Sequence, residues 1–190
     1  MKVNHQFLNE VFFIPDWDVE YLLLGTFNPE GGEKVNYFYG RESNFTWKIL
    51  SEIFENDFNP YDVNNFNKFI EQLKLRKIAC IDVIKCVEFD EKTYDITRIT
   101  GKGYKDSNII NTKVKREYNT REIISIIEKN KNVKVFTTWG KGANLKEWRN
   151  EVAKMENIVN LKSPSRAARV PKGVEKFNYI LKYWKSNIKL

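Results

Sequence analysis

The fold of this chain follows from one stretch, Tyr21-Leu22-Leu23-Leu24-Gly25-Thr26-Phe27-Asn28-Pro29. Its first half is apolar without a break, which is typical of a strand buried on both faces of a sheet. Its second half is a Gly/Asn/Pro turn, which ends such a strand. The stretch therefore predicts a central strand of a parallel sheet followed by a loop.

Three further apolar runs have the same character as Tyr21–Phe27. They lie at Ile78–Ile84, Val133–Thr138 and Ile158–Leu161. Each gap between consecutive runs is long enough for a helical crossover, which neighbouring parallel strands require. The predicted fold class is α/β, a three-layer α/β/α sandwich with a central four-stranded parallel sheet, and the chain fits one domain, 1–190.

Helical patterns fill the gaps between these runs. Asn44–Glu55 and Asn65–Leu75 each gather large apolar side chains on one face. A capping-box-like pair, Asn119 with Glu122, predicts the start of a third helix, and Pro171 predicts the start of a last one. The last helix would bury a stripe of Val174, Phe177, Leu181 and Trp184. The polar stretch from Phe89 to Tyr118 has little periodicity, which predicts an irregular segment, either a functional loop or a partly disordered one.

Composition limits the classes of function. The net charge is +7 and 14% of the residues are aromatic, a combination that favours a polyanionic partner with exposed bases. Two cysteines, Cys80 and Cys86, are too few for a disulfide framework or a four-cysteine cluster, so we expect no metal and no cofactor. No secretory signal or apolar run of membrane length is present, so we expect a cytoplasmic protein without a membrane partner. We also expect a monomer.

The expected binding site lies at one edge of the sheet. In open parallel sheets, ligands bind beyond the carboxyl ends of the strands. The loops expected there are Gly25–Glu30, Asp82–Lys85, Thr138–Ala143 and Ser163–Arg169. We expect these loops and the aromatic segment Tyr37–Trp47 to form the walls of one cleft.

Five short motifs occupy these loops and the helix starts beside them. They are Gly25-Thr26-Phe27-Asn28-Pro29, Tyr39-Gly40-Arg41-Glu42-Ser43-Asn44-Phe45-Thr46-Trp47, Ile81-Asp82-Val83, Asp106-Ser107-Asn108-Ile109 and Leu161-Lys162-Ser163-Pro164-Ser165-Arg166-Ala167. In these motifs, which span most of its length, the chain resembles the uracil-DNA glycosylase superfamily, nearest its mismatch-specific uracil and hypoxanthine (deoxyinosine) DNA glycosylase branches.

The resemblance implies a monofunctional DNA glycosylase of base excision repair. Such an enzyme hydrolyses the N-glycosidic bond of a deaminated base, uracil or hypoxanthine, in double- or single-stranded DNA. It must extrude the nucleotide, stack the base on an aromatic ring and read the polar edge of the base in a small pocket. Since no lysine is marked for Schiff-base chemistry, we do not expect strand incision.

Two residues of the aromatic segment are candidates for base binding. Tyr39 is the candidate stacking ring, and its alternative is a place in the core beside Tyr37 and Phe38. Asn44 matches the pocket asparagine of the family. It would bind the base or hold the attacking water, and the alternative is that it caps the helix that follows.

The turn after the first strand supplies the other catalytic candidate. The family carries a water-positioning asparagine in this turn. If the glycines of the two motifs are aligned, Phe27 takes the position of that asparagine and is a candidate base-binding ring. If the prolines are aligned, Asn28 takes the position. Asn28 before Pro29 is also an ordinary turn former. The turn contains no aspartate, so a strong general base is missing unless Glu30 reaches the site, and we expect slow catalysis by orientation and electrostatics.

The last motif predicts contacts with the DNA backbone. Ser163, Ser165 and Arg166 are of the residue types that bind phosphates. Lys141, after the third strand, either meets a phosphate at a helix start or is an ordinary solvated lysine.

The chain departs from the family at two places. Many members carry a histidine in the last loop, whereas the single histidine here is His5, near the start of the chain. Arg41 and Glu42 replace the His-Pro that precedes the pocket asparagine, which predicts an altered substrate range.

Two other functions stay open. The first is a nucleic-acid binder that kept the fold and lost catalysis, which the altered loops would explain. The second is a magnesium-dependent nuclease, because Asp82 followed by Asp90-Glu91-Lys92 loosely imitates a carboxylate-lysine metal site. A requirement for magnesium would separate the nuclease from a glycosylase.

Overall fold

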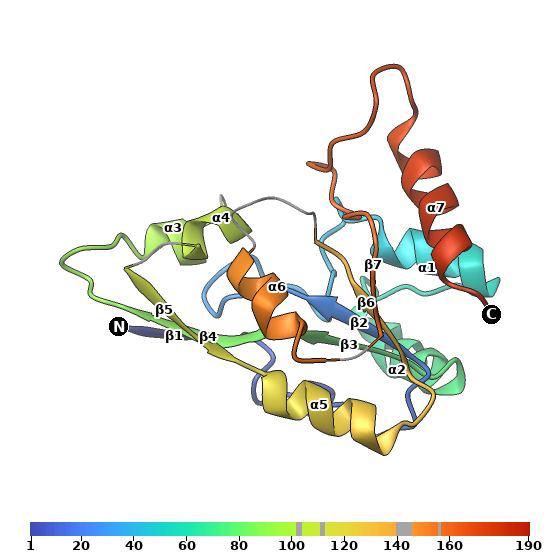
Figure 1. Ribbon diagram of the computed structural model, residues 1–190, viewed down its shortest axis with the longest axis horizontal. Coiled ribbons are helices and arrows are strands. Elements are labelled where there is room, and N and C mark those ends of the chain that lie inside the picture. Colours follow the sequence, from blue (N-terminus) through green and yellow to red (C-terminus); the bar gives the residue numbers. More distant parts are fainter. Residues whose placement is uncertain (102–103, 111–112, 140–145, 156) are drawn as a thin grey trace.

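A computed structural model describes residues 1–101, 104–110, 113–139, 146–155 and 157–190 (Figure 1). A parallel sheet forms its centre, with the strand order β3-β2-β6-β7. The strands are β2 (Tyr21–Gly25), β3 (Ile78–Asp82), β6 (Lys134–Thr137) and β7 (Ile158–Asn160). The predicted α/β class and its four-stranded parallel sheet are confirmed.

Helices cover both faces of this sheet. One group is α1 (Thr46–Phe54), α2 (Phe66–Leu75) with the short η1 (Val63–Asn65), and α7 (Lys176–Asn187). The other group is α5 (Thr120–Lys129) and α6 (Lys146–Val152). A hydrophobic core lies on each face of the sheet, and successive residues of β2 point into opposite cores. Leu23 packs with the first group of helices and Leu22 with the second, and both are fully buried. Burial on both faces explains the unbroken apolar runs of the sequence. Within the described ranges, no helix has both the length and the apolar composition needed to cross a membrane.

The sequence does not predict a second sheet, which is three-stranded and antiparallel. It consists of β1 (Lys2–Asn4), β4 (Ile84–Phe89) and β5 (Val114–Tyr118), in the order β1-β4-β5. The prediction of one strand over 78–84 is wrong at its end, because β3 stops at Asp82 and Ile84 opens β4.

The stretch 89–118 is also more regular than expected. It contains β5 and two short helices, α3 (Thr97–Thr100) and α4 (Asp106–Ile109). β5 has no apolar run, because its exposed residues, Lys115 and Glu117, alternate with more buried ones and one of the more buried residues is Arg116.

The last helix does not begin at Pro171. The Glu175 carboxylate caps α7 by accepting from the backbone N–H groups of Phe177 (3.0 Å) and Asn178 (2.6 Å). Val174, expected on the buried stripe, therefore precedes the helix and is 43% exposed. The helix buries Ile180 and Trp184 completely.

The predicted capping box of α5 is absent. Asn119 precedes this helix, but its side-chain amide donates to the carbonyl oxygen of Asp82 at 2.7 Å instead of receiving a helix N–H. This buried contact links the start of α5 to the end of β3 and supports the backbone at Asp82.

The strand order places a topological switch between β2 and β6. From β2 the chain moves to β3 on one side, and it later returns to β6 on the other side of β2. The loops that follow β2 and β6 therefore diverge and leave a crevice beyond the carboxyl ends of the strands.

Candidate active site

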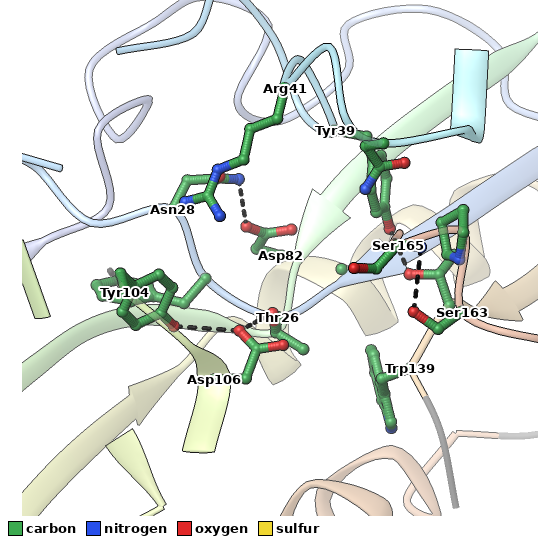
Figure 2. A pocket seen from close by; sticks show the side chains of 15 residues that line it. Thr26, Asn28, Tyr39, Arg41, Asp82, Tyr104, Asp106, Trp139, Ser163 and Ser165 are labelled. Carbon is green, nitrogen blue, oxygen red and sulfur yellow. Dashed lines mark hydrogen bonds between the residues drawn. The ribbon is translucent and has the colours of Figure 1, made fainter. Parts of the chain in front are cut away.

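A cavity of about 270 Å³ lies at this crevice (Figure 2). Its walls come from the turn after β2, the loop before α1, the end of β3, the segment that leads into α4, the end of β6 and the loop after β7. The structure thus brings together the strand-end loops that the sequence places at one edge of the sheet. Its volume is just below the roughly 300 to 1,000 Å³ of pockets for drug-sized ligands, so it suits one small ring system.

Two segments that are far apart in the sequence form one continuous wall. Asn44 pairs with Ser165 in an isolated antiparallel bridge. The N–H of Phe45 donates to the carbonyl oxygen of Pro164 at 2.9 Å. The aromatic loop and the serine loop are therefore joined through their backbones beside the cavity.

Tyr39 lines the cavity, and its neighbours fill the core. Tyr37 and Phe38 are completely buried, whereas Tyr39 is half-buried and its hydroxyl is 3.0 Å from Thr138 Oγ1. Burial raises the pKa of the Tyr39 phenol well above its usual value, so the phenol stays protonated at neutral pH.

The backbone of Tyr39 is in the left-handed region, with φ of 56°. A side chain other than glycine is disfavoured there by roughly 1–2 kcal/mol. Surrounding contacts therefore hold the ring of Tyr39 in its place against a local preference for another conformation.

Both candidates of the turn after β2 reach the cavity. Phe27 is 3% exposed, and its ring meets the rings of His5 and Tyr104 edge-on, with centroids 5.8 and 6.4 Å apart. Asn28 donates its side-chain Nδ2–H to Asp82 Oδ2 at 2.9 Å. The amide of Asn28 is thus already committed to a carboxylate.

Asn44 lies between the start of α1 and the cavity. Its Oδ1 accepts from the N–H of Thr46 at 2.9 Å and from the Thr46 hydroxyl at 2.7 Å, so it does support the start of α1. The residue also lines the cavity. Among the described residues its Nδ2 has no partner, which leaves one amide donor available to a ligand.

Asp82 ends β3 and lies at the cavity, and its carboxylate is held through one oxygen. Oδ2 accepts from Asn28 and is 2.9 Å from His5 Nε2. The Phe7 N–H donates to His5 Nδ1 at 3.1 Å, so Nε2 carries the imidazole proton and donates it to Asp82. Gly25 makes room for this carboxylate, because a Cβ there would lie 2.0 Å from Asp82 Oδ1.

The sequence analysis missed the role of His5. This residue follows β1 and is 2% exposed, inside a cluster of four aromatic rings. Those rings belong to Phe7, Phe13, Phe27 and Phe38. No local pattern marks the residue; the signal available was that it is the single histidine of the chain.

Asp106 is a second carboxylate at the cavity. Its Oδ1 accepts from the Thr26 hydroxyl at 2.9 Å and from the Tyr104 hydroxyl at 3.2 Å (Figure 2). Burial raises the pKa of Asp106; the nearby charge of Asp82 also raises it, while the two hydroxyl groups and Arg41 lower it.

The turn after β2 has no aspartate, but the cavity beside it does contain carboxylates. Glu30 does not supply one, because it is exposed and does not line the cavity. Asp82 and Asp106 come instead from the end of β3 and from α4, which the turn sequence could not reveal.

Arg41 extends into the cavity toward Asn28 (Figure 2). Its Nε is 3.2 Å from Glu33 Oε2, and its guanidinium carbon lies 6.0 Å from the centre of the Tyr104 ring. Arg41 thus brings a positive charge to the cavity.

Some residues of the loop after β7 line the cavity, and others lie outside it. Ser163 and Ser165 are half-buried and line the cavity, and the Ser165 hydroxyl accepts from the N–H of Ala167 at 3.1 Å. Arg166 is exposed and borders a neighbouring cavity of about 520 Å³. Lys141 lies outside the described residues.

The described residues do not assemble the nuclease site. Among them, no group of three or more His, Cys, Asp or Glu side chains is placed to hold a metal ion. Asp90 follows the far end of β4 and borders a different cavity together with Met1 and Lys2. The six residues of β4 separate it from the region of Asp82, a span of about 20 Å for an extended strand.

Comparison with known proteins supports the fold. No family model matches the sequence, and no curated protein matches it. The structure is similar to the solution NMR structure of a candidate uracil DNA glycosylase from Methanosarcina acetivorans, with a TM-score of 0.53 and 16% sequence identity over 91% of each chain. The chain therefore has a fold like that of this protein.

Proposed function

We propose that the chain is a monofunctional DNA glycosylase that hydrolyses the N-glycosidic bond of a deaminated base, uracil or hypoxanthine, after base flipping. The observation that carries this proposal is the base-sized cavity at the topological switch, where aromatic rings, a free amide and two carboxylates meet. The fold supports the proposal, because the similar solved structure is a candidate uracil DNA glycosylase.

The aromatic side chains receive the extruded base. Tyr39 and Phe27 present rings to the cavity, and stacking of one base on an aromatic ring contributes about 1–3 kcal/mol. This energy offsets part of the cost of unstacking the nucleotide from DNA.

Asp82 and Asn44 read the polar edge of the base. Asp82 Oδ1 is a hydrogen-bond acceptor, and Asn44 Nδ2 is a donor without a partner among the described residues. Uracil and hypoxanthine offer a ring N–H beside a carbonyl oxygen, which matches this pair. Cytosine and adenine have a lone pair on the corresponding ring nitrogen, which a carboxylate repels.

The DNA backbone runs over the serine loop. Ser163 and Ser165 supply hydroxyl groups beside the cavity, and exposed Arg166 supplies a positive charge. In this proposal Lys141 is the second cation that binds a phosphate. The net charge of +7 attracts the polyanion over a longer range.

The chemistry needs no cofactor in this proposal. Breaking the glycosidic bond develops positive charge on the sugar, which the two carboxylates stabilise in a preorganised site. Asn28 contributes by holding Asp82 in place.

The test is a set of oligonucleotides, duplex and single-stranded, that carry uracil, hypoxanthine, xanthine or thymine, with guanine opposite in the duplexes. They are incubated in chelator and then cleaved with alkali. We expect abasic sites from uracil or hypoxanthine DNA. Tight binding without any abasic product would support the inactive binder, and incision that needs magnesium would support the nuclease.

Variants of two asparagines sharpen this test. Asn44→Ala removes the free amide donor and should reduce the rate of base release. Asn67→Ala is the matched control, because Asn67 is exposed on α2 and does not line the cavity. An Asn44→Ala enzyme as active as the control would remove Asn44 from the proposed site.

A further inference from the structure

Asp106 has the geometry of a positioned base, a role beyond the charge stabilisation that the proposed function gives to both carboxylates. It opens α4, the Asp-Ser-x-Ile segment that sequence analysis singled out. Two hydroxyl groups, of Thr26 and Tyr104, hold Oδ1. Among the described residues, Oδ2 has no partner, and the side chain lines the cavity.

The other polar side chains of the cavity are less suited to take a proton. The amides of Asn28 and Asn44 have no basic site at neutral pH. Oδ2 of Asp82 is held by His5 and Asn28, and its Oδ1 lies against the backbone at Gly25 and is assigned to the base edge in the proposed function. Asp106 is therefore the carboxylate with an oxygen available to accept a hydrogen bond from a water molecule.

We infer that Asp106 is the general base of the hydrolysis, an inference that rests on the proposed function. The C1′–N bond breaks, and its electron pair passes to the base nitrogen. The oxygen of a water molecule forms the new bond to C1′, and Oδ2 of Asp106 takes a proton from this water. The departing base anion takes a proton from solvent, and Asp106 returns its own to solvent, so one water is consumed.

The surroundings of Asp106 determine the pH at which it can act. Burial and the charge of Asp82, on β3, raise the pKa of Asp106 above its usual value. Arg41, from the loop before α1, and the hydroxyl groups of Thr26 and Tyr104 lower it, but the net shift is upward. A general base works when it is deprotonated, so the rate should fall as the pH drops through this raised pKa. The acid limb should therefore begin at a higher pH than for an exposed aspartate.

The test measures single-turnover base release against pH for the wild type and two variants. Asp106→Asn should lower the rate on the order of 100- to 10,000-fold and remove the acid limb from the remaining activity. Thr26→Val removes one hydroxyl that lowers the pKa of Asp106, so this variant should stay active and lose activity at a higher pH than the wild type. Asp57→Asn is the matched control, because Asp57 is exposed and does not line this cavity.

The outcomes separate the two proposals. If the wild type releases no base from any substrate, the proposed function fails. If the wild type is active and Asp106→Asn matches it in rate and pH profile, only the role of Asp106 is overturned. Should Asp106→Asn fail to fold, as judged by circular dichroism, Thr26→Val decides, and an unchanged acid limb in that variant overturns the inference.

Discussion

His5 Nε2 lies 2.9 Å from Asp82 Oδ2, and both side chains are buried, 0% and 3% exposed. The contact joins the segment after β1 to the end of β3, and thus connects the antiparallel sheet to the cavity in the parallel one. Because Asp82 lies at the cavity, a residue near the start of the chain orients a group of the candidate site.

Replacing His5 with phenylalanine should reduce both stability and activity. His5→Phe keeps a ring within the aromatic cluster but removes the hydrogen bond to a buried carboxylate, which is worth about 1.5–3 kcal/mol. Urea unfolding measures the loss, and base release should fall because Asp82 loses its orientation. Asn9→Ala, at an exposed position four residues along the chain, should leave base release near the wild-type rate. A His5→Phe protein with unchanged stability would contradict this account of the contact.

Gly25→Ala should disturb the candidate site directly. The new Cβ would lie 2.0 Å from Asp82 Oδ1 and 3.0 Å from the Tyr39 hydroxyl, so the carboxylate must move. We expect at least a tenfold loss of base release, since small misplacements in active sites cost on the order of 100-fold. Gly173→Ala is the control: its φ of +81° also disfavours alanine, but no atom lies within 4 Å of its added Cβ. That variant should lose stability and keep its activity, and equal activity losses in both variants would argue against a specific role for Gly25.

Two substitutions of Tyr39 should separate its ring from its hydroxyl group. Tyr39→Phe loses only the contact with Thr138 and should retain most of the activity. Tyr39→Ala loses the stacking surface and should weaken binding of DNA that carries an extrudable base by about 1–3 kcal/mol. Fluorescence anisotropy with a non-hydrolysable nucleotide analogue measures this difference. If both variants bind as tightly as the wild type, Tyr39 does not stack on the base.

Arg166 should contribute to DNA affinity through charge alone. Arg166→Ala removes an exposed cation of the serine loop, so binding should weaken to a similar degree for all sequences. The slope of log K against log salt should become shallower by about 1. Arg76→Ala, at the exposed end of α2, is the charge-matched control and should change neither quantity. An unchanged slope in Arg166→Ala would place this arginine away from the phosphates.

Local sequence was sufficient for the central sheet and insufficient for the second one. The runs that contain β2 and β6 are apolar because both of their faces are buried, and such runs can be read without knowing their partners. β4 follows β3 with a single residue, Val83, between them, so the apolar run continues across a change of sheet. β5 has three charged residues in a row, and its pairing with β4 is a long-range contact that no local pattern expresses.

The candidate site shows the same division. Tyr39, Asn44 and Asn28 stand in motifs beside strand ends, and the structure places all three at one cavity. The sequence alone could not distinguish the ring of Tyr39 from the core rings next to it, because the direction of the Tyr39 side chain depends on the left-handed backbone of that residue. Asn44 contacts the start of α1 through Oδ1, which leaves Nδ2 without a partner among the described residues, and its role in binding a base stays a prediction.

By itself, the amino-acid order determined the strands of the parallel sheet, the turn that ends β2 and the edge where a ligand would bind. These features depend on side-chain patterns within a few neighbouring positions. Only the tertiary structure decided that His5 supports Asp82, that Asp106 has one oxygen held and one open to the cavity, and that Asn44 meets Ser165. Those contacts join segments that are remote in the chain, and their existence depends on the order of the strands and on which side chains the packing removes from water.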